Sequence, residues 1–295
     1  MKLIIPMSGQ GNRFIKAGYQ TPKPLIRVEG KPIIEHVLNM FPEEEDIIFI
    51  CNEEHLTNTG MREILQRLKP QATIISIPVH QKGPAYAITY AFDIIDDNED
   101  VMVSYCDFTQ NWNYSEFKQK VKDLEVAGAI PAYTGFHPHL LHKNLYGGIL
   151  CDDNNMIIDY KEKHCFTEKP EDSHHSSGAY YFSTGKLLKK YTSEVIHHDI
   201  NVGGEHYMSL LYYLFLRDNL PIYAPEVSHF MQWGTPEDLE EYEAWSRKIH
   251  NDFNKNKLET DIPIHRKNFV SIPYQEETEE FKKIYNYWKS YFQNS

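Results

Sequence analysis

Short hydrophobic runs alternate with helix-like stripes over the first 106 residues of the chain. Continuous apolar runs predict buried strands, and apolar residues spaced by three and four predict helices. The predicted strands are Leu3–Ile5, Asp46–Cys51, Thr73–Pro78 and Asp100–Cys106, and the helices between them are Lys31–Phe41, Glu53–Leu68 and Gly83–Ile95. This alternation predicts an α/β fold with a parallel sheet and helices on both faces.

The pattern is less regular in the second half of the chain. Apolar runs and stripes there predict further strands and helices, and a polar DDNN turn at 152–155 predicts a hairpin. The strands are Ala127–Tyr133, Leu145–Cys151, Met156–Tyr160, Gly178–Phe182 and Pro221–Val227, and the helices are Tyr114–Leu124, Lys186–Ile196, Glu205–Leu216 and Pro236–His250.

The residues after position 250 differ in character from the rest. A polar, irregular stretch from Asn251 to Ile272 precedes a predicted helix, Tyr274–Phe292, with an aromatic face. We therefore divide the chain into a main domain, residues 1–250, and a C-terminal extension, residues 251–295. An aromatic face of this kind needs a partner. We expect it to pack on its own domain, with a homodimer contact as the alternative.

Composition and charge restrict the classes of partner. The chain has 30 Lys and Arg against 42 Asp and Glu, a formal charge of −12, which argues against nucleic acid or an anionic membrane. No apolar run approaches the ~20 residues of a membrane-spanning helix, and no signal peptide follows Met1. The four cysteines are scattered and form no CxxC motif. Together these features predict a cytoplasmic protein with reduced thiols.

A glycine-containing loop, Ser8-Gly9-Gln10-Gly11-Asn12-Arg13, follows the first predicted strand. Two glycines allow backbone N–H groups to approach an anion. Arg13 and Lys23 add cations, and the prolines on both sides of Lys23 restrict the segment that carries it. The chain lacks the Gly-Lys-Ser/Thr of a P-loop, and Phe14 replaces the third glycine of a dinucleotide fingerprint. The loop therefore predicts a site for a nucleoside triphosphate.

The stretch GQGNRF followed by TPKPLIRVEGKPIIEHVL resembles the opening motifs of the sugar-phosphate nucleotidylyltransferases, of the capsule and lipopolysaccharide precursor type. The resemblance runs from Met1 to Trp245 and implies the GT-A-like nucleotidyltransferase fold, a Rossmann-like mixed, mainly parallel sheet. It also implies catalytic roles for Arg13 and Lys23. The nucleotide-binding residues that it implies are Met7, Ser8, Gly9, Gln10, Gly11, Asn12, Gln81 and Gly83. The base that Gln81 contacts stays open.

The same resemblance implies a metal site. Asp107 follows a predicted strand, as the glycine-containing loop does, so both are expected at one edge of the sheet. An Asp at this position is a metal ligand in the family, and we expect Asp107 to hold Mg²⁺. The segment from Gln232 to Glu237 resembles a closing motif in which an Asp precedes Gly-Thr-Pro-Glu, but Gln232 replaces that Asp. An amide oxygen can also coordinate Mg²⁺, so Gln232 is the expected second ligand.

Acceptor binding is expected from three further segments. Glu162 and Lys163 resemble the family's Glu-Lys pair, in which the lysine meets the acceptor phosphate. Glu168-Lys169-Pro170 is the competing match, because its proline fits the commoner form. Gly178 begins a predicted strand, and Glu205 lies in a segment that resembles the family's Gly-Glu-Tyr-Tyr.

These residues predict a nucleotidyltransferase that joins an NTP to a phosphorylated acceptor and releases pyrophosphate. A sugar 1-phosphate used in surface-polysaccharide precursor synthesis is the default acceptor, and a non-sugar phosphate is the alternative. A glycosyltransferase that uses a nucleotide sugar is a second hypothesis, although Phe108 and Thr109 follow Asp107 where a DxD motif would need another Asp. A non-catalytic nucleotide-binding module is the third, and Gln232 is its best argument.

Overall fold

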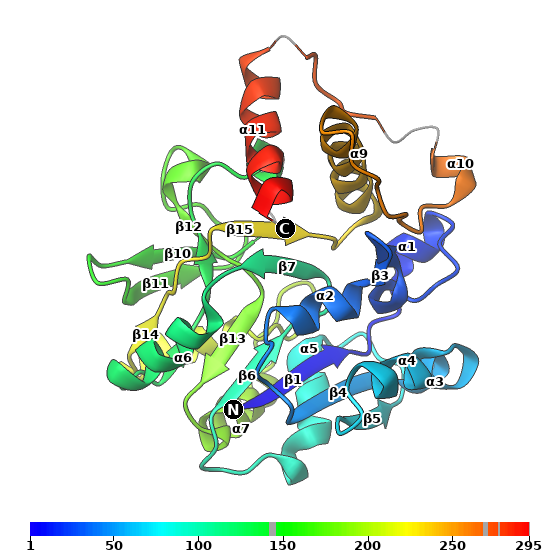
Figure 1. Cartoon of the computed structure of the whole chain (residues 1–295). Helices are drawn as coiled ribbons and strands as arrows, with labels where there is room; N and C mark the ends of the chain where they lie inside the picture. The colour runs from blue at the N-terminus through cyan, green and yellow to red at the C-terminus, as the bar shows by residue number, and fades with distance from the viewer. Residues whose placement is uncertain (142–145, 268–270, 277, 295) are drawn as a thin grey trace.

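The computed structural model describes residues 1–141, 146–267, 271–276 and 278–294. A seven-stranded sheet in the order β14-β8-β13-β6-β1-β4-β5 forms its centre (Figure 1). Its strands are β1 (Lys2–Met7), β4 (Ile47–Asn52), β5 (Thr73–Ile77), β6 (Val101–Ser104), β8 (Gly128–Ala129), β13 (Ala179–Phe182) and β14 (Ile222–Tyr223). The pairs within β6-β1-β4-β5 are parallel, and β13 runs antiparallel to β6 and β8. The predicted mixed, mainly parallel sheet is confirmed.

Alternate residues of the central strands enter two separate hydrophobic clusters. Leu3 and Ile5 of β1 belong to one cluster, and Ile4 between them belongs to the other. Because successive side chains of a strand point to opposite faces, both faces of the sheet are buried. One face is covered by α2 (Ile33–Asn39), α4 (Met61–Leu68) and α6 (Tyr114–Asp123), and the other by α5 (Pro84–Ile88), α7 (Gly185–His197) and α8 (Leu210–Arg217).

Several predicted helices are shorter or divided in the structure. The prediction of one helix over Glu53–Leu68 is wrong, because Thr59-Gly60 separates α3 (Glu53–Asn58) from α4. The predicted helix after Gly83 consists of α5 and a 3-10 helix, η2 (Thr89–Ile94). The helix expected to start at Glu205 starts at Leu210 instead. Glycine and polar residues at these starts favour turns over a continued helix.

Smaller sheets complete the fold, and some of their short strands were not predicted from the hydrophobic pattern. The predicted strand over Ala127–Tyr133 divides, since β8 stays in the main sheet and β9 (Ala132–Tyr133) joins a smaller sheet in the order β11-β10-β12-β9. Its other strands are β10 (Gly148–Cys151), β11 (Ile157–Lys161) and β12 (His174–Ser176), and two-stranded sheets pair β7 (Phe108–Asn111) with β15 (His229–Gln232) and β2 (Arg27–Val28) with β3 (Lys31–Pro32). The first residue of the predicted strand Leu145–Cys151 lies outside the described residues.

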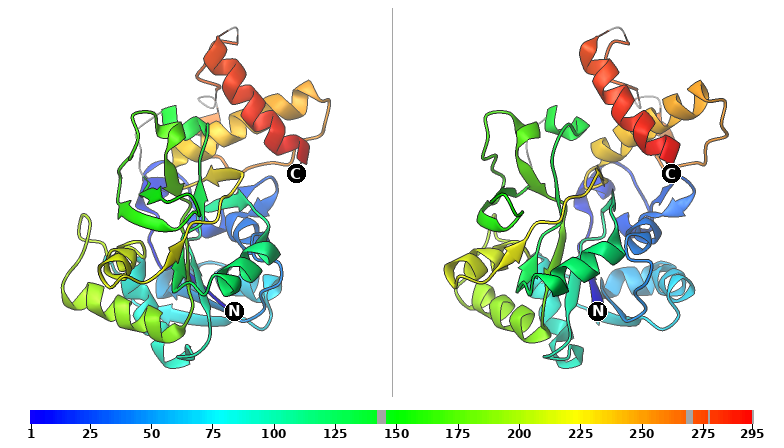
Figure 2. Two further views of the ribbon diagram at one scale, coloured as in Figure 1. Left: turned by 90° about the vertical axis from the view of Figure 1, so that its left-hand side faces the viewer. Right: turned by 60° about the vertical axis from the view of Figure 1, so that its left-hand side comes forward.

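The C-terminal helices lie on the side of the main sheet toward which β1 runs, as the smaller sheet does (Figure 2). α9 (Pro236–Asp252) starts with a capping box in which Thr235 and Asp238 bond each other's backbone N–H groups. The predicted terminal helix is α11 (Glu279–Asn294), and a short helix, α10 (Ile264–Lys267), precedes it. Ile284 and Trp288 of α11 lie in the same cluster as Trp245 of α9, so the aromatic face packs on its own chain.

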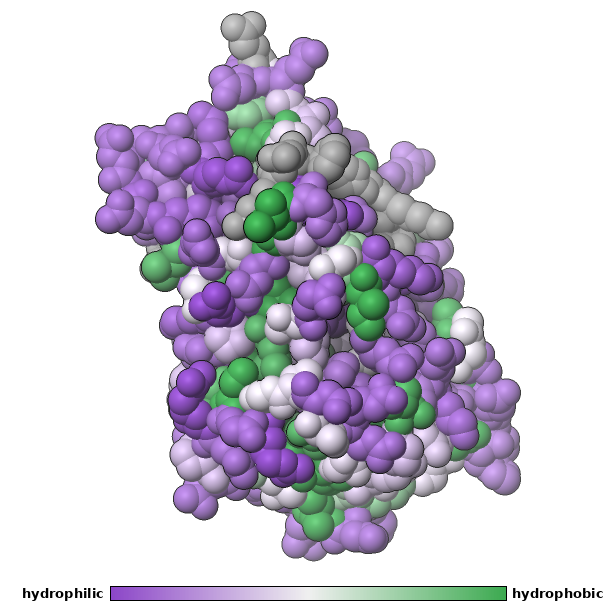
Figure 3. Space-filling view, turned by 90° about the vertical axis from the view of Figure 1, so that its right-hand side faces the viewer, coloured by the Kyte–Doolittle hydropathy of each residue, from purple (hydrophilic) through white to green (hydrophobic). Residues whose placement is uncertain are grey.

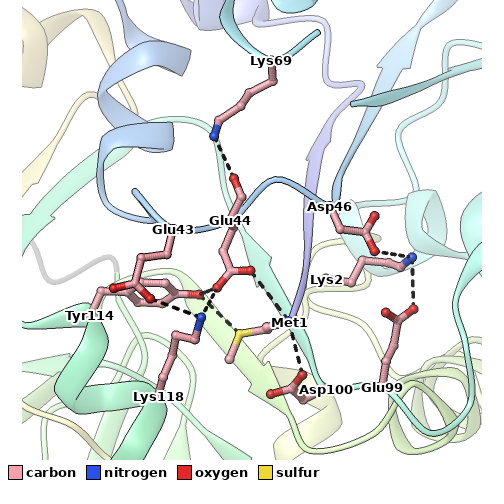
Figure 4. Close-up of polar contacts among 10 residues, drawn as sticks. All are labelled: Met1, Lys2, Glu43, Glu44, Asp46, Lys69, Glu99, Asp100, Tyr114 and Lys118. Atoms are coloured by element: carbon pink, nitrogen blue, oxygen red, sulfur yellow. Dashed lines mark hydrogen bonds and ion pairs between the residues drawn. The ribbon is translucent and has the colours of Figure 1, made fainter. Parts of the chain in front are cut away.

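Charged side chains anchor the beginning of β1, the strand that leads to the glycine-containing loop (Figure 4). Lys2 forms ion pairs with Asp46 at 3.0 Å and with Glu99 at 3.1 Å. The buried Glu44 accepts hydrogen bonds from Tyr114 Oη at 2.9 Å and Lys118 Nζ at 2.8 Å. These contacts hold β1 against the segments before β4 and β6, and they lie at the end of the strand opposite the loop.

The face that carries α3, α4 and α10 is mainly hydrophilic, with single hydrophobic side chains scattered over it (Figure 3). Ile264 of α10 is 84% exposed. Isolated exposed hydrophobic residues are common on protein surfaces and mark no interface by themselves. Among the described residues, no helix is both long enough and apolar enough to cross a membrane.

Candidate active site

The carboxyl ends of β1 and β6 bring the glycine-containing loop and Asp107 together. The two strands are parallel neighbours, with Ile4 opposite Val103, so the segments that follow them leave the sheet at one edge. A cavity of about 510 Å³ opens there. All eight residues predicted to bind the nucleotide line it, as do Arg13, Lys23 and Asp107. The glycine-containing loop and Asp107 therefore lie at one edge of the sheet, as expected.

The loop ends in a tight turn whose backbone conformation is favourable for glycine and uncommon for other residues. Gly11 has φ +70° and ψ 33°, a left-handed conformation, and stands immediately before α1 (Asn12–Lys16). Ser8 is buried, and its carbonyl oxygen accepts a hydrogen bond from Asn52 Nδ2 at 3.1 Å. Ser8 Oγ also lies 3.2 Å from His80 Nε2. The loop is thus held from β4 and from the segment after β5, which leaves Arg13 exposed at the first turn of α1.

Lys23 and Asp107 form an ion pair at the centre of the site. Lys23 Nζ lies 2.8 Å from Asp107 Oδ2, and both side chains are mostly buried. Burial lowers the pKa of Lys23, but the Asp107 carboxylate outweighs this effect and holds the pKa above its ordinary value. Lys23 is therefore a full cation at neutral pH. A cation and a carboxylate in one cavity can meet a phosphate and a metal ion respectively.

Two loops beside the cavity are hydrogen-bonded to each other. His206 N donates to Lys82 O, and Ala85 N donates to His206 O, each at 2.9 Å. Gly83 lies between these bonds with φ +86°, and a Cβ atom there would come within 2.6 Å of His206 N. Only glycine fits this position, so the segment that carries Gln81 is held against the segment that carries Glu205. Glu205, which was expected to bind the acceptor, lines this first cavity together with the residues expected to bind the nucleotide.

A second cavity, of about 300 Å³, adjoins the first. Arg13, Lys23 and Asp107 line both cavities, so the two meet at the ion pair. The predicted acceptor residues Glu162, Lys163 and Gly178 line the second cavity. The competing match fails on placement, because Lys169 lines neither cavity. The remaining lining is rich in hydroxyl groups, from Ser176, Ser177, Ser209, Thr235, Tyr180 and Tyr207 among others.

Hydrogen bonds with surrounding hydroxyl groups hold Glu162 in place. Its Oε1 accepts hydrogen bonds from Tyr160 Oη, at 2.6 Å, and from Ser209 Oγ, and its backbone N donates to Tyr213 Oη at 2.8 Å. These bonds fix the end of β11 against the start of α8. Lys163 follows with φ +52°, a left-handed conformation that is uncommon for lysine. The turn directs the chain so that Lys163 reaches the cavity that Glu162 also lines.

The closing segment brings a second carboxylate to the site. Gln232 Nε2 donates to Asp238 Oδ1 at 2.8 Å, whereas Gln232 Oε1 is buried with no hydrogen-bond partner among the described residues. A Cβ atom on Gly234 would lie 3.6 Å from Asp107 Oδ2 and 3.8 Å from Asp238 Oδ2, so the two carboxylates flank this glycine. Burial raises the pKa of Asp238 to about 6. The sequence analysis did not place Asp238 at the site.

Sequence reasoning also missed His80, Tyr105 and Tyr207, which line the first cavity. His80 directly precedes Gln81, and Tyr207 lies two residues after Glu205, so proximity to predicted site residues was the available signal. His137 lines neither cavity, since it is 1% exposed and packs on Tyr133. The described residues contain no cluster of three His, Cys, Asp or Glu side chains that could hold a metal ion.

Solved structures share this fold. The nucleoside-diphosphate-sugar pyrophosphorylase from Vibrio cholerae matches with a TM-score of 0.66 and 21% identity, over 80% of this chain and 97% of that one. The inositol-1-phosphate CTP transferase from T. maritima matches with a TM-score of 0.62 and 13% identity, over 80% of this chain and 90% of the other. At these identities the likeness shows the fold.

Curated relatives show similarly low sequence identity. The bifunctional protein GlmU of Staphylococcus epidermidis is 26% identical over 218 residues, which is 73% of this chain and 45% of the relative. GlmU of Methanocaldococcus jannaschii is 24% identical over 184 residues, or 62% of this chain and 40% of the relative. The chain thus spans less than half the length of these relatives. The family model described as nucleotidyl transferase matches residues 2–206, which hold the glycine-containing loop, Lys23, Asp107 and Lys163. The chain therefore belongs to the nucleotidyl transferase family.

Proposed function

We propose that the protein joins a nucleoside triphosphate to a phosphorylated acceptor and releases pyrophosphate. The observation that carries this proposal is the pair of cavities that meet at Lys23 and Asp107. One cavity contains the glycine-containing loop, and the other contains Lys163 and many hydroxyl groups. Two anionic substrates could therefore approach each other from opposite sides of one cation. This arrangement favours transfer between two bound substrates over simple nucleotide binding.

The reaction needs positioning and charge neutralisation more than proton transfer. The acceptor phosphate is largely ionised near neutral pH, because its second pKa is about 6. One of its oxygens forms a bond to the α-phosphorus, and the bond from that phosphorus to the bridging β-oxygen breaks. Both electrons of the broken bond leave with pyrophosphate, so no general base is required. Arg13 would hold the pyrophosphate end, Lys23 the α-phosphate and Lys163 the acceptor phosphate.

The residues around Gly234 fit a magnesium ion. Asp107 and Asp238 would supply carboxylate oxygens, and Gln232 would supply a buried amide oxygen that has no hydrogen-bond partner among the described residues. Oxygen donors of these two kinds are the ones that Mg²⁺ prefers. Bound there, Mg²⁺ would neutralise charge on the triphosphate. Asp107 would hold the ion once a substrate phosphate competes for Lys23, which pairs with Asp107 at 2.8 Å in this structure.

A sugar 1-phosphate is the proposed acceptor class. The hydroxyl-rich lining of the second cavity supports it, since hydroxyl groups of protein and sugar can donate and accept hydrogen bonds to each other. A non-sugar polyol phosphate fits the same chemistry. A role in surface-polysaccharide precursor synthesis, a cytoplasmic location and a homodimer stay predictions.

A substrate screen tests the proposal. The four common NTPs would each be mixed with Mg²⁺ and a panel of sugar 1-phosphates and polyol phosphates, and released pyrophosphate would be measured. We expect release with one NTP and at least one acceptor, and loss of that release in Asp107→Ala. A protein that folds normally, binds an NTP and releases no pyrophosphate with any acceptor would support the non-catalytic alternative. Sugar transfer from a nucleotide sugar would support a glycosyltransferase.

A further inference from the structure

A segment of the C-terminal extension lies directly beside α1 and the β2–β3 hairpin, which follow the glycine-containing loop. We name residues 257–266 the clasp. It passes α1 and the β2–β3 hairpin before the chain continues to α11 (Figure 1). Two backbone hydrogen bonds of 2.9 Å join the clasp to the hairpin, from Gly30 N to Glu259 O and from Asp261 N to Arg27 O. The clasp therefore pairs with the chain that follows Lys23.

Side chains reinforce this backbone pairing. Both oxygens of the Asp261 carboxylate accept hydrogen bonds from Arg27, at 3.1 to 3.3 Å. Lys257 Nζ lies 2.6 Å from Glu243 of α9 and 3.5 Å from Glu29 of the hairpin. Arg266 Nη2 donates to Glu240 Oε2 of α9 at 2.9 Å. The clasp is thus fastened to α9 on one side and to the hairpin on the other.

The side chain of His265 connects the clasp to the end of α1. Its Nε2 lies 3.2 Å from the carbonyl oxygen of Ala17, the residue that ends α1, and can donate a hydrogen bond to it. The ring packs on Gly18, which has φ +90°, and a Cβ atom at Gly18 would come within 2.5 Å of the ring. The imidazole therefore occupies space that only a glycine leaves free.

The contacts of the clasp enclose the two segments that carry the site's cations. α1 has only five residues and contains Arg13, so a contact at its last turn reaches the first turn directly. Lys23 stands between Gly18 and Arg27, and both of these residues contact the clasp. A short helix has little stability of its own and depends on tertiary contacts for its position.

We propose that the clasp is a positioning element of the nucleotide site and that His265 is its positioning residue. The hydrogen bond from His265 to Ala17 holds α1 so that Arg13 and the backbone N–H groups of the glycine-containing loop face the triphosphate. His265 acts through α1 and touches no substrate. This inference rests on the proposed function of the loop, and it gives the C-terminal extension a part in nucleotide binding.

Three single variants test the proposal in the full-length chain. His265→Ala removes the donor, His265→Gln keeps an amide donor of similar reach, and His198→Ala is the control. His198 is an exposed histidine at the end of α7 that packs on His197 and touches none of the segments above. Pyrophosphate with Mg²⁺ is the probe, because it requires neither the correct base nor the correct acceptor. Its dissociation constant would be measured by calorimetry, and amide hydrogen exchange would be followed over residues 9–19.

We expect His265→Ala to weaken pyrophosphate binding about fivefold, the effect of one hydrogen bond, and to speed exchange over residues 9–19. His265→Gln should restore most of the affinity, and His198→Ala should match the wild type. With the NTP found in the substrate screen, KM for that NTP should rise while KM for the acceptor stays unchanged. Unchanged pyrophosphate affinity in His265→Ala would overturn the proposal. Equal acceleration of exchange over the whole chain would also overturn it, because it would indicate a purely structural role.

The experiment separates this inference from the proposed function. A wild-type protein that binds neither pyrophosphate nor any NTP would overturn the proposed function of the loop. The positioning claim would then be judged by hydrogen exchange over residues 9–19 alone. Faster exchange confined to those residues in His265→Ala would support it, and unchanged exchange would refute it.

Discussion

At the residue scale, an ion pair stands at the centre of the candidate site. Lys23 Nζ and Asp107 Oδ2 lie 2.8 Å apart where the two cavities meet. In the proposed function Lys23 would meet a substrate phosphate and Asp107 a metal ion, so each group now pairs with a charge that its ligand would replace. A metal ion that binds Asp107 must therefore compete with Lys23. We expect metal ion and triphosphate to bind more strongly together than either binds alone.

Because Lys23 and a metal ion would compete for Asp107, Lys23→Met should have opposite effects on metal binding and on NTP binding. Without nucleotide, the affinity for Mn²⁺ should rise about twofold to fivefold, because a partly exposed ion pair is worth up to about 1 kcal/mol. Affinity for the NTP should fall tenfold or more, since hydrogen bonds to charged groups contribute about 1.5–3 kcal/mol. Electron paramagnetic resonance of free Mn²⁺ and nucleotide titration would measure the two effects. A fall in both affinities would contradict the competition.

Arg13→Ala tests the loop itself. Arg13 is exposed at the first turn of α1 and lines both cavities. Its removal should weaken NTP binding about tenfold and leave the free energy of unfolding within about 0.5 kcal/mol of the wild type. Lys16→Ala, on the same short helix but outside both cavities, is the matched control. Unchanged NTP affinity in Arg13→Ala would remove the triphosphate assignment of the loop.

At the scale of elements, the C-terminal extension has two parts with different expected roles. The clasp contacts α1 and the β2–β3 hairpin, whereas α11 packs its hydrophobic face on α9 and β15. Tyr287 Oη of α11 donates to Phe230 O of β15 at 3.0 Å, and Lys283 forms an ion pair with Glu171 at 2.5 Å. We expect the loss of α11 alone to harm stability more than chemistry.

Ile284→Ala tests the part played by α11. Ile284 is fully buried in the main hydrophobic cluster, so truncation of its side chain should lower the free energy of unfolding by about 2–5 kcal/mol. The folded fraction should keep wild-type KM for the NTP, because Ile284 touches neither cavity. Denaturant titration and steady-state kinetics would measure these quantities. Lys282→Ala, on the exposed side of the same helix, should change stability by less than about 0.5 kcal/mol. Equal losses in both variants would show that α11 contributes no packing.

At the scale of the whole molecule, buried histidines should make the fold sensitive to acid. Burial lowers the pKa of His137 to about 3, and it also lowers the pKa values of His36, His175 and His229. In the unfolded chain a histidine has a pKa near 6.5. Below that pH the unfolded state binds more protons than the folded state, so stability is complete above pH 6.5 and falls as the pH drops toward 3.

His137 alone should cost about 2 kcal/mol of stability between pH 7.5 and pH 5, at about 1.4 kcal/mol for each pH unit below 6.5. Asp238 acts in the opposite direction, since its pKa of about 6 lies above that of a free Asp and its protonation favours the folded state. Urea titrations at several pH values would show the balance. His137→Asn should flatten the dependence relative to wild type, and an unaltered slope would exclude His137 as the cause.

Much of the site was predictable because its residues lie close together along the chain. The loop before Arg13 and the segment around Lys23 can each be recognised from the local spacing of their residues. Asp107 could be placed on the same edge because parallel strands end on one side of a sheet. Asp238 could not, since its nearness to Asp107 depends on how β15 pairs with β7, and both strands are short and only partly apolar. The same lack of a hydrophobic pattern hid β12.

The amino-acid sequence by itself determined the central sheet, its loop and the family of the protein. Hydrophobic periodicity is a local property, and buried parallel strands express it strongly. The tertiary structure alone decided where the two cavities meet, which charges pair across them and where the C-terminal extension packs. These features join residues far apart in the chain, such as His265 and Ala17, through contacts of one or two atoms. No local pattern encodes such contacts, because they form only after the hydrophobic core has placed the segments side by side.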